Sequence, residues 1–177
     1  MTAQGGVASL VICKKGFITM KRLAIIPARG GSKRIPRKNI KEFCGKPIIV
    51  YSIDAALKSG IFDEVMVSTE DAEIAEIAKK YGASVPFMRS AEASGDYATD
   101  DDVMDEVLEK YEEMGKTYDT FALIYACAPF ITPEQLREAF ELLEKNDVDS
   151  VIPLTRYSYP PQRSFVSRDG NVQYRYR

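Results

Sequence analysis

From Met20 onward, short apolar segments alternate with amphipathic helical segments, and this alternation limits the fold more than any other feature of the chain. Strands that alternate with helices of this length form βαβ units and a mostly parallel sheet covered on both faces. The sequence therefore predicts a three-layer, doubly wound α/β fold. We expect strands at 23–28, 64–69, 84–88, 120–125 and 148–154, and helices at 47–60 and 74–81 and from Thr99 and Thr132.

The length of 177 residues favours one domain. Residues 1–19 contain a short apolar patch that basic residues follow rather than precede, which is the wrong order for a signal peptide. We therefore assign residues 1–19 to an extension outside the fold and residues 20–177 to the domain. The alternating segment 172–177 ends without a turn, so we expect its partner strand to be absent and the domain to be truncated at its C-terminal end.

Composition removes several classes of function. The net charge of -2 gives no reason to expect binding to nucleic acid or to an anionic membrane, and no apolar run is long enough to span a bilayer. The chain has no histidine, which excludes an imidazole base and a histidine-rich zinc site. Cys13, Cys44 and Cys127 lack metal-type spacing and indicate reduced thiols in a cytoplasmic protein.

The segment that carries chemistry is the glycine-rich basic loop 28–39, directly after the first expected strand. Gly30 and Gly31 let backbone N–H groups approach an anion, Ser32 adds a hydroxyl donor, and Arg29 and Lys33 add positive charge. The loop matches neither G-x-x-x-x-G-K-[ST] nor G-x-G-x-x-G. Ligands of open parallel sheets bind beyond the carboxyl ends of the strands, so this position favours a polyphosphate site over a solvated basic turn.

The run 26–39 resembles the signature loop of the CMP-sialic acid synthetase family, and the resemblance extends from Met20 to about residue 170. It continues through the segments 45–47, 67–71, 81–83 and 128–130. The resemblance implies a nucleotide-diphospho-sugar transferase-like fold. Tyr125 and the segments 128–130 and 158–163 are most similar to the branch of the family that acts on pseudaminic acid.

The resemblance implies an enzyme that couples CTP to an acidic nine-carbon sugar and releases pyrophosphate. It implies catalytic roles for Arg29 and Lys33, sugar contacts from Tyr125, Gln162 and Arg163, a homodimer, and Mg²⁺ as a clamp on the phosphates. The residues expected at CTP are Arg29, Gly30, Gly31, Ser32, Lys33, Lys38, Asn39 and Arg89.

We assign no metal ligand, because the family's metal-binding aspartates lie in a later segment that resembles nothing in this chain. Asp100, Asp101 and Asp102 fit the first turn of a helix better than a metal cluster, and Asp71 and Glu73 fit a helix start. Cys127 stands where the family usually has threonine, which weakens one expected polar contact.

Three alternatives stay open. The acceptor can be sialic acid or another 2-keto sugar acid. The 177-residue chain can be a CTP-binding fragment with little or no turnover, since the later segment is missing. A nucleotide-dependent regulator is the third alternative, and no positive feature of the sequence supports it.

Overall fold

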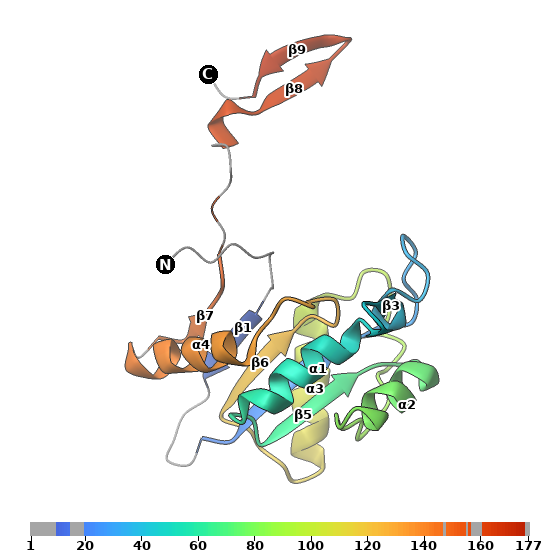
Figure 1. Ribbon diagram of the computed structural model, residues 1–177, viewed down its shortest axis with the longest axis vertical. Helices are drawn as coiled ribbons and strands as arrows, with labels where there is room; N and C mark the ends of the chain where they lie inside the picture. The colour runs from blue at the N-terminus through green and yellow to red at the C-terminus, as the bar shows by residue number, and fades with distance from the viewer. Residues whose placement is uncertain (1–9, 15–19, 147, 155, 157–160, 176–177) are drawn as a thin grey trace.

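The computed structural model describes residues 10–14, 20–146, 148–154, 156 and 161–175, and its centre is a five-stranded sheet in the order β5-β2-β6-β1-β7 (Figure 1). β2 pairs in parallel with β5 and β6, whereas β1 pairs antiparallel with β6 and β7. Every strand of this sheet except β1 therefore runs in the same direction, and the predicted mostly parallel α/β architecture is confirmed. The strands are β1 (Leu10–Lys14), β2 (Arg22–Pro27), β5 (Glu64–Ser68), β6 (Thr120–Ile124) and β7 (Ser150–Val151).

Four α-helices connect these strands, close to where the sequence predicts them: α1 (Ile49–Ser59), α2 (Ala72–Lys80), α3 (Asp100–Glu113) and α4 (Pro133–Lys145). Thr99 and Thr132 each close a capping box at the start of α3 and α4, and Gly60 ends α1 in the left-handed conformation at φ 67°. Among the described helices, none is both long and apolar enough to cross a membrane. The shorter elements are η1 (Lys38–Ile40), β3 (Glu42–Phe43), β4 (Lys46–Pro47), η2 (Pro161–Arg163), β8 (Phe165–Arg168) and β9 (Asn171–Tyr174).

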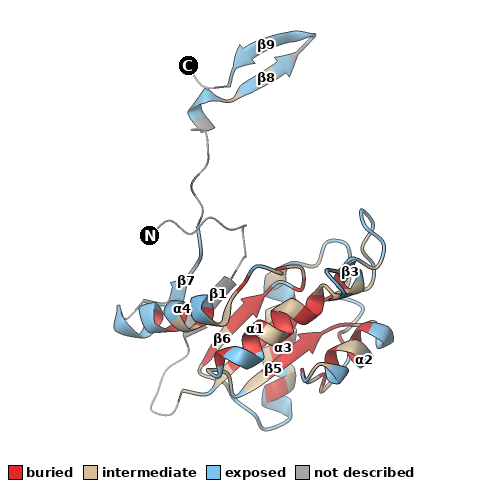
Figure 2. Ribbon diagram, in the orientation of Figure 1, coloured by how far each residue is buried: buried red, intermediate tan, exposed pale blue. Residues whose placement is uncertain are grey.

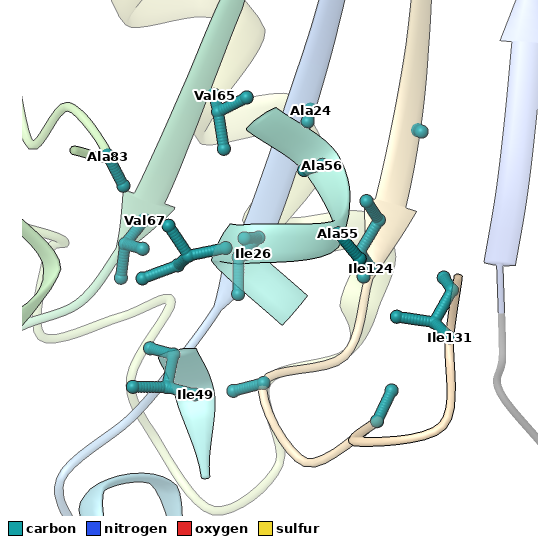
Figure 3. Close-up of a cluster of buried hydrophobic side chains, with 14 of the residues drawn as sticks. Ala24, Ile26, Ile49, Ala55, Ala56, Val65, Val67, Ala83, Ile124 and Ile131 are labelled. Atoms are coloured by element: carbon teal, nitrogen blue, oxygen red, sulfur yellow. The ribbon is translucent and has the colours of Figure 1, made fainter. Parts of the chain in front are cut away.

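The side chains of β2 divide the interior into two cores. Ala24 and Ile26 face one side of the sheet and Leu23 and Ile25 face the other, and all four are fully buried. Residues of α1, α2 and α4 cover the first side, and residues of α3 cover the second. Figure 2 shows the buried strands enclosed by helices, and Figure 3 shows the larger of the two cores around Ile26. Burial on both faces explains why these strands are continuous apolar runs in the sequence.

The structure corrects two predictions about the ends of the chain. Leu10–Lys14 forms β1 within the sheet, so these residues do not lie outside the fold; they pair antiparallel with the open edge of β6. The final strand is not partnerless, because β9 pairs with β8 in a hairpin turned by Asp169 and Gly170 at φ 50° and 77°. Both residues have the positive φ values that a tight hairpin turn requires. Residues 1–9, 15–19 and 176–177 lie outside the described part of the chain.

The strand expected at 84–88 is reduced to one parallel bridge between Met66 and Ser84. Val67 N donates to Ser84 O at 2.9 Å, and Ser84 N donates to Val65 O at 2.8 Å. After this bridge the chain turns toward the carboxyl end of β5, where Arg89 N donates to Thr69 O at 2.9 Å. This departure from the sheet brings the following segment, residues 89–99, to the edge where the glycine-rich loop lies.

A partly buried carboxylate joins the first residue of β5 to α3 and to the turn after it. Glu64 accepts hydrogen bonds from the hydroxyls of Tyr111, Tyr118 and Ser84 at 2.7, 2.5 and 2.7 Å, and from Lys116 Nζ at 3.0 Å. Burial opposes ionisation of this carboxyl, but the four donors outweigh it and lower the pKa of Glu64 to about 2. The ionised carboxylate therefore stabilises the folded protein.

We predict that Glu64→Gln lowers the free energy of unfolding by about 1–3 kcal/mol at pH 7, because it replaces an acceptor that serves four donors. The pKa of Glu64 is lower in the folded than in the unfolded protein, so the stabilisation is complete above pH 4.5 and is lost as the pH falls toward 2. Urea unfolding should show the gap between wild type and variant shrinking below pH 4.5, with exposed Glu113→Gln as control. A gap that is independent of pH would contradict this role.

Candidate functional site

The loops that follow β2, β5 and β6 meet at the carboxyl end of the parallel strands, around a cavity of about 380 Å³. This is the edge at which open α/β sheets bind ligands. Five residues that the sequence predicts at the substrates lie in the cavity wall: Arg29, Lys38, Asn39, Arg89 and Tyr125. The remaining lining residues are Pro27, Ala93, Gly95, Asp96, Ala98, Thr99, Asp100, Val103, Ala126 and Cys127.

Two carboxylates that follow β5, those of Glu70 and Asp71, lie against the glycine-rich loop at Gly30. Gly30 N donates to Glu70 Oε1 at 2.7 Å, and a Cβ added to Gly30 would lie only 2.4 Å from Asp71 Oδ2. At Gly31, by contrast, an added Cβ would meet nothing within 4 Å. The N–H group of Gly30 that the sequence analysis offers to an anion is bonded to Glu70 in this structure. Gly30 is required because Asp71 leaves no room for a side chain.

Arg37, near the C-terminal end of the loop, joins the loop to the start of α2. Its guanidinium is paired with Asp71 and Glu73, and the Nη2 atom lies 3.1 Å from Asp71 Oδ1. The hydrogen bond from Arg37 lowers the pKa of Asp71, which stays ionised. Asp71 is also the N-cap of α2 and accepts from Ile74 N at 3.0 Å. The prediction that Asp71 and Glu73 start a helix is confirmed, with the addition that both carboxylates anchor the loop.

Two of the cations of the loop, Arg29 and Lys33, pair with a carboxylate of the segment 89–99. Lys33 Nζ donates to Asp96 Oδ2, and Arg29 Nη1 lies 3.5 Å from Asp96 Oδ1 and 3.3 Å from Gly95 O. The hydrogen bond from Lys33 lowers the pKa of Asp96, so the carboxylate is ionised at neutral pH. Sequence reasoning missed Asp96, because no local pattern connects it with a loop more than sixty residues earlier.

Asn39 is a buried residue of the cavity wall, and both the nitrogen and the oxygen of its side-chain amide make hydrogen bonds. Nδ2 donates to Arg29 O at 2.9 Å, and Oδ1 lies 3.2 Å from Cys127 Sγ. Burial raises the pKa of Cys127, so the neutral thiol donates to the amide oxygen. Asn39 thereby fixes the backbone at Arg29. The thiol at position 127 keeps a weak polar contact at this point.

Arg89 lines the cavity and is not a surface charge, since only 7% of its area is exposed. Nε donates to Ser68 Oγ at 2.9 Å and Nη2 donates to Ser68 O. Burial lowers the pKa of Arg89, and the nearby carboxylates of Glu70 and Glu106 counteract this effect. A guanidinium remains protonated under these conditions. The site therefore contains a fixed, desolvated positive charge.

Tyr125 and Asp100 also line the cavity. Tyr125 follows β6, and its hydroxyl donates to Oδ2 of Asp100, the first residue of α3. This hydrogen bond, together with burial, raises the pKa of Tyr125 to about 12. The first-turn position of Asp100, Asp101 and Asp102 is confirmed. Asp100 also faces the cavity, which the first-turn interpretation did not reveal.

Gln162 and Arg163, predicted at the sugar, lie apart from the cavity. Both are exposed in η2, next to the β8–β9 hairpin that stands away from the central sheet in Figure 1. Within the described ranges, no group of three or more cysteine, aspartate or glutamate side chains could hold a metal ion. The cavity thus brings together Tyr125 and four of the predicted nucleotide residues, Arg29, Lys38, Asn39 and Arg89. Gly30, Gly31, Ser32 and Lys33 of the loop are not among its lining residues, and neither are Gln162 and Arg163.

The comparisons with known proteins agree with this geometry. A family model described as Cytidylyltransferase matches residues 23–169. Pseudaminic acid cytidylyltransferase of Campylobacter jejuni is 47% identical over 155 residues, which cover 88% of this chain and 67% of that protein. CMP-N,N'-diacetyllegionaminic acid synthase of Legionella pneumophila is 39% identical and is matched over 86% of this chain and 66% of its own length.

Solved structures give the same result. A CMP:2-keto-3-deoxy-manno-octonic acid synthetase complexed with CTP superimposes with a TM-score of 0.61 and 25% identity, over 72% of this chain and 48% of that one. A cytidylyltransferase of Leptospira borgpetersenii gives a TM-score of 0.58 and 27% identity, over 72% and 50% of the two chains. The chain thus spans about half the length of these two structures. It belongs to the cytidylyltransferase family.

We predict that Gly30→Ala lowers the free energy of unfolding by about 1–3 kcal/mol, because the new methyl group overlaps Asp71. It should also weaken nucleotide binding, since the loop must move away from Glu70 and Asp71. Gly31→Ala is the matched control for stability, because its added methyl group meets open space. Thermal unfolding and calorimetric titration with CTP measure both effects. Equal effects of the two substitutions would contradict the steric role of Gly30.

Proposed function

We propose that this chain is the nucleotide-binding part of a cytidylyltransferase that couples CTP to pseudaminic acid and gives the CMP-sugar and pyrophosphate. The observation that carries the proposal is the position of the basic loop 29–33. Its first residue, Arg29, lines a cavity whose wall also contains the buried guanidinium of Arg89. The 47% identity with a pseudaminic acid cytidylyltransferase supports the choice of substrates.

In the proposed reaction, the anomeric hydroxyl oxygen of the sugar attacks the α-phosphorus of CTP. A new oxygen–phosphorus bond forms, the bond from the α-phosphorus to the bridging oxygen breaks, and pyrophosphate leaves with that electron pair. The hydroxyl proton is lost to solvent. Arg29 and Lys33 would neutralise the charge on the phosphates and on the leaving pyrophosphate, which is the main contribution that a protein makes to such a transfer.

The nucleotide would lie with its phosphates at the loop and its base toward Arg89. Arg89 and Asn39 are both buried and held in place by protein contacts, so they present a rigid polar surface. A base that cannot pair with these two side chains would bind with their remaining polar atoms desolvated and unpaired. This would lower its affinity and favour cytosine. Gly31, Ser32 and Lys38 stay in the proposed CTP site as parts of the same loop.

We place the sugar beside Tyr125, which lines the cavity at the end of β6. Gln162 and Arg163 remain proposed sugar contacts, although both are distant from the cavity in this structure. An arginine is suited to the carboxylate of a sugar acid, because its guanidinium can bind both oxygens. Relatives named for legionaminic acid and for N-acylneuraminate make these sugar acids the alternative acceptors.

Mg²⁺ is part of the proposal as a phosphate clamp, which would neutralise charge on the triphosphate when bound. The described residues do not fit a dedicated metal site, because they contain no group of three possible ligands. We therefore assign no ligand and derive no step through the ion. We also propose a homodimeric, cytoplasmic enzyme; the free thiols of Cys44 and Cys127 agree with a reducing compartment.

We predict that Arg29→Ala and Lys33→Ala each weaken CTP binding roughly tenfold to a hundredfold, the range expected for one charged hydrogen bond. Arg34→Ala is the matched control, since Arg34 is an exposed cation of the same loop that does not line the cavity and, unlike Arg29 and Lys33, has no described ion pair with Asp96. Calorimetric titration measures the affinities, and circular dichroism checks the fold. Unchanged affinity in both Arg29→Ala and Lys33→Ala would remove the loop from the nucleotide site.

A test of specificity addresses the two substrates together. We predict that CTP raises the melting temperature more than UTP, ATP or GTP at equal concentration, because the wrong base leaves buried polar groups unpaired. A pyrophosphate-release assay with CTP and Mg²⁺ should then be faster with pseudaminic acid than with N-acetylneuraminic acid. Equal stabilisation by all four nucleotides would count against a cytidine site, and a preference for N-acetylneuraminic acid would reassign the sugar.

A further inference from the structure

The cations that the proposed function assigns to the triphosphate are already paired in the free protein. Lys33 Nζ donates to Asp96 Oδ2, Arg29 Nη1 lies 3.5 Å from Asp96 Oδ1, and Gly95 O accepts from Arg29 at 3.3 Å. Asp96 and Gly95 both line the cavity. A carboxylate of the protein therefore occupies the place where an anionic ligand of the loop would bind.

The segment that carries Asp96 is anchored to α3 at both ends and makes few described contacts with the rest of the chain between them. On one side Ala93 is buried in the core beneath α3, and Ser90 bonds to Glu106 of that helix at 2.6 and 2.9 Å. On the other side Thr99 is fixed by the capping box of α3.

Between these anchors, the described hydrogen bonds from residues 95–97 to distant parts of the chain end on Arg29 and Lys33. Tyr97, in the middle of the stretch, has 97% of its area exposed. The stretch can therefore leave the loop without unpacking the core.

We propose that Asp96 acts as an internal counter-ion that occupies the polyphosphate-binding cations of the free protein and is displaced by the phosphates of the incoming nucleotide. This inference rests on the proposed function, because it assigns Arg29 and Lys33 to the triphosphate. Asp96 is a positioning residue: it holds the two cations at the cavity before the substrate arrives.

The physical reason is a competition between two anions for the same cations. Each pair of Asp96 with Lys33 or Arg29 is partly exposed, and such pairs contribute little to stability. A triphosphate carries several negative charges and more acceptor oxygens, so it outcompetes a single carboxylate. Because the carboxylate must be released first, its removal should increase affinity for polyphosphates. Affinity for a ligand without phosphates should not change.

The test compares Asp96→Asn with Asp101→Asn, which removes the same charge from an exposed position without a described contact to either cation. Calorimetric titrations with CTP, inorganic tripolyphosphate and cytidine are run at low salt on both variants and on the wild type. We expect Asp96→Asn to bind CTP and tripolyphosphate roughly threefold to tenfold more tightly than the wild type. Cytidine affinity should be unchanged, and Asp101→Asn should behave as the wild type.

A second measurement tests whether the gain is electrostatic, whereas the comparison with Asp101→Asn separates competition from bulk charge. The gain in Asp96→Asn should shrink at about 0.5 M salt, where exposed ion pairs are screened. Equal or weaker tripolyphosphate binding by Asp96→Asn, an equal gain in Asp101→Asn, or no tripolyphosphate binding at all would overturn the inference. A gain for tripolyphosphate without CTP binding would leave Asp96 in its role and refute the proposed function. Tight CTP binding without a gain would refute the role of Asp96 alone.

Discussion

The parallel pairing of β2 between β5 and β6 is the constraint on which the rest of the structure depends. β2 has neighbours on both edges and helices on both faces, so its central residues are fully buried. A strand in this environment can expose only its ends, and the polar groups of the protein collect where the chain leaves it. The basic loop after β2, the carboxylates after β5 and Tyr125 after β6 converge for this reason. The cavity is a consequence of strand order.

Electrostatic balance shapes the site as strongly as its positive charge does. Glu70 and Asp71 lie against the glycine-rich loop at Gly30, and Asp96 pairs with its cations Arg29 and Lys33. Arg29 and Lys33 pair with Asp96, and Arg37 pairs with Asp71, so these cations of the loop have anionic partners in the free protein. The protein thus holds a group of cations ready for an anionic ligand while its net charge stays near zero.

Features that the chain encodes locally could be predicted from the sequence. Apolar periodicity located the helices, and the loop 28–39 indicated a phosphate site. The capping residues Thr99 and Thr132 marked the starts of α3 and α4. Asp96 and Asp100 could not be found in this way, because their roles depend on contacts with residues distant in the sequence.

Two errors at the chain ends have different causes. The Asp169-Gly170 pair is a recognised hairpin signal, so β8 and β9 were predictable from residues that the sequence analysis did not weigh. The place of β1 was not predictable, since its partner lies more than one hundred residues away.

The order of strands also divides the site by distance along the chain. β2 reaches β5 after one helix, pairing Leu23 with Glu64, whereas its pairing with β6 joins Leu23 to Phe121. Closing the longer loop costs more chain entropy, and contacts between distant residues slow folding. The phosphate half of the site, at the ends of β2 and β5, therefore belongs to a local unit that can assemble early. The half that contains Tyr125 and Cys127 depends on β6, so the complete cavity requires the pairing that closes the longer loop.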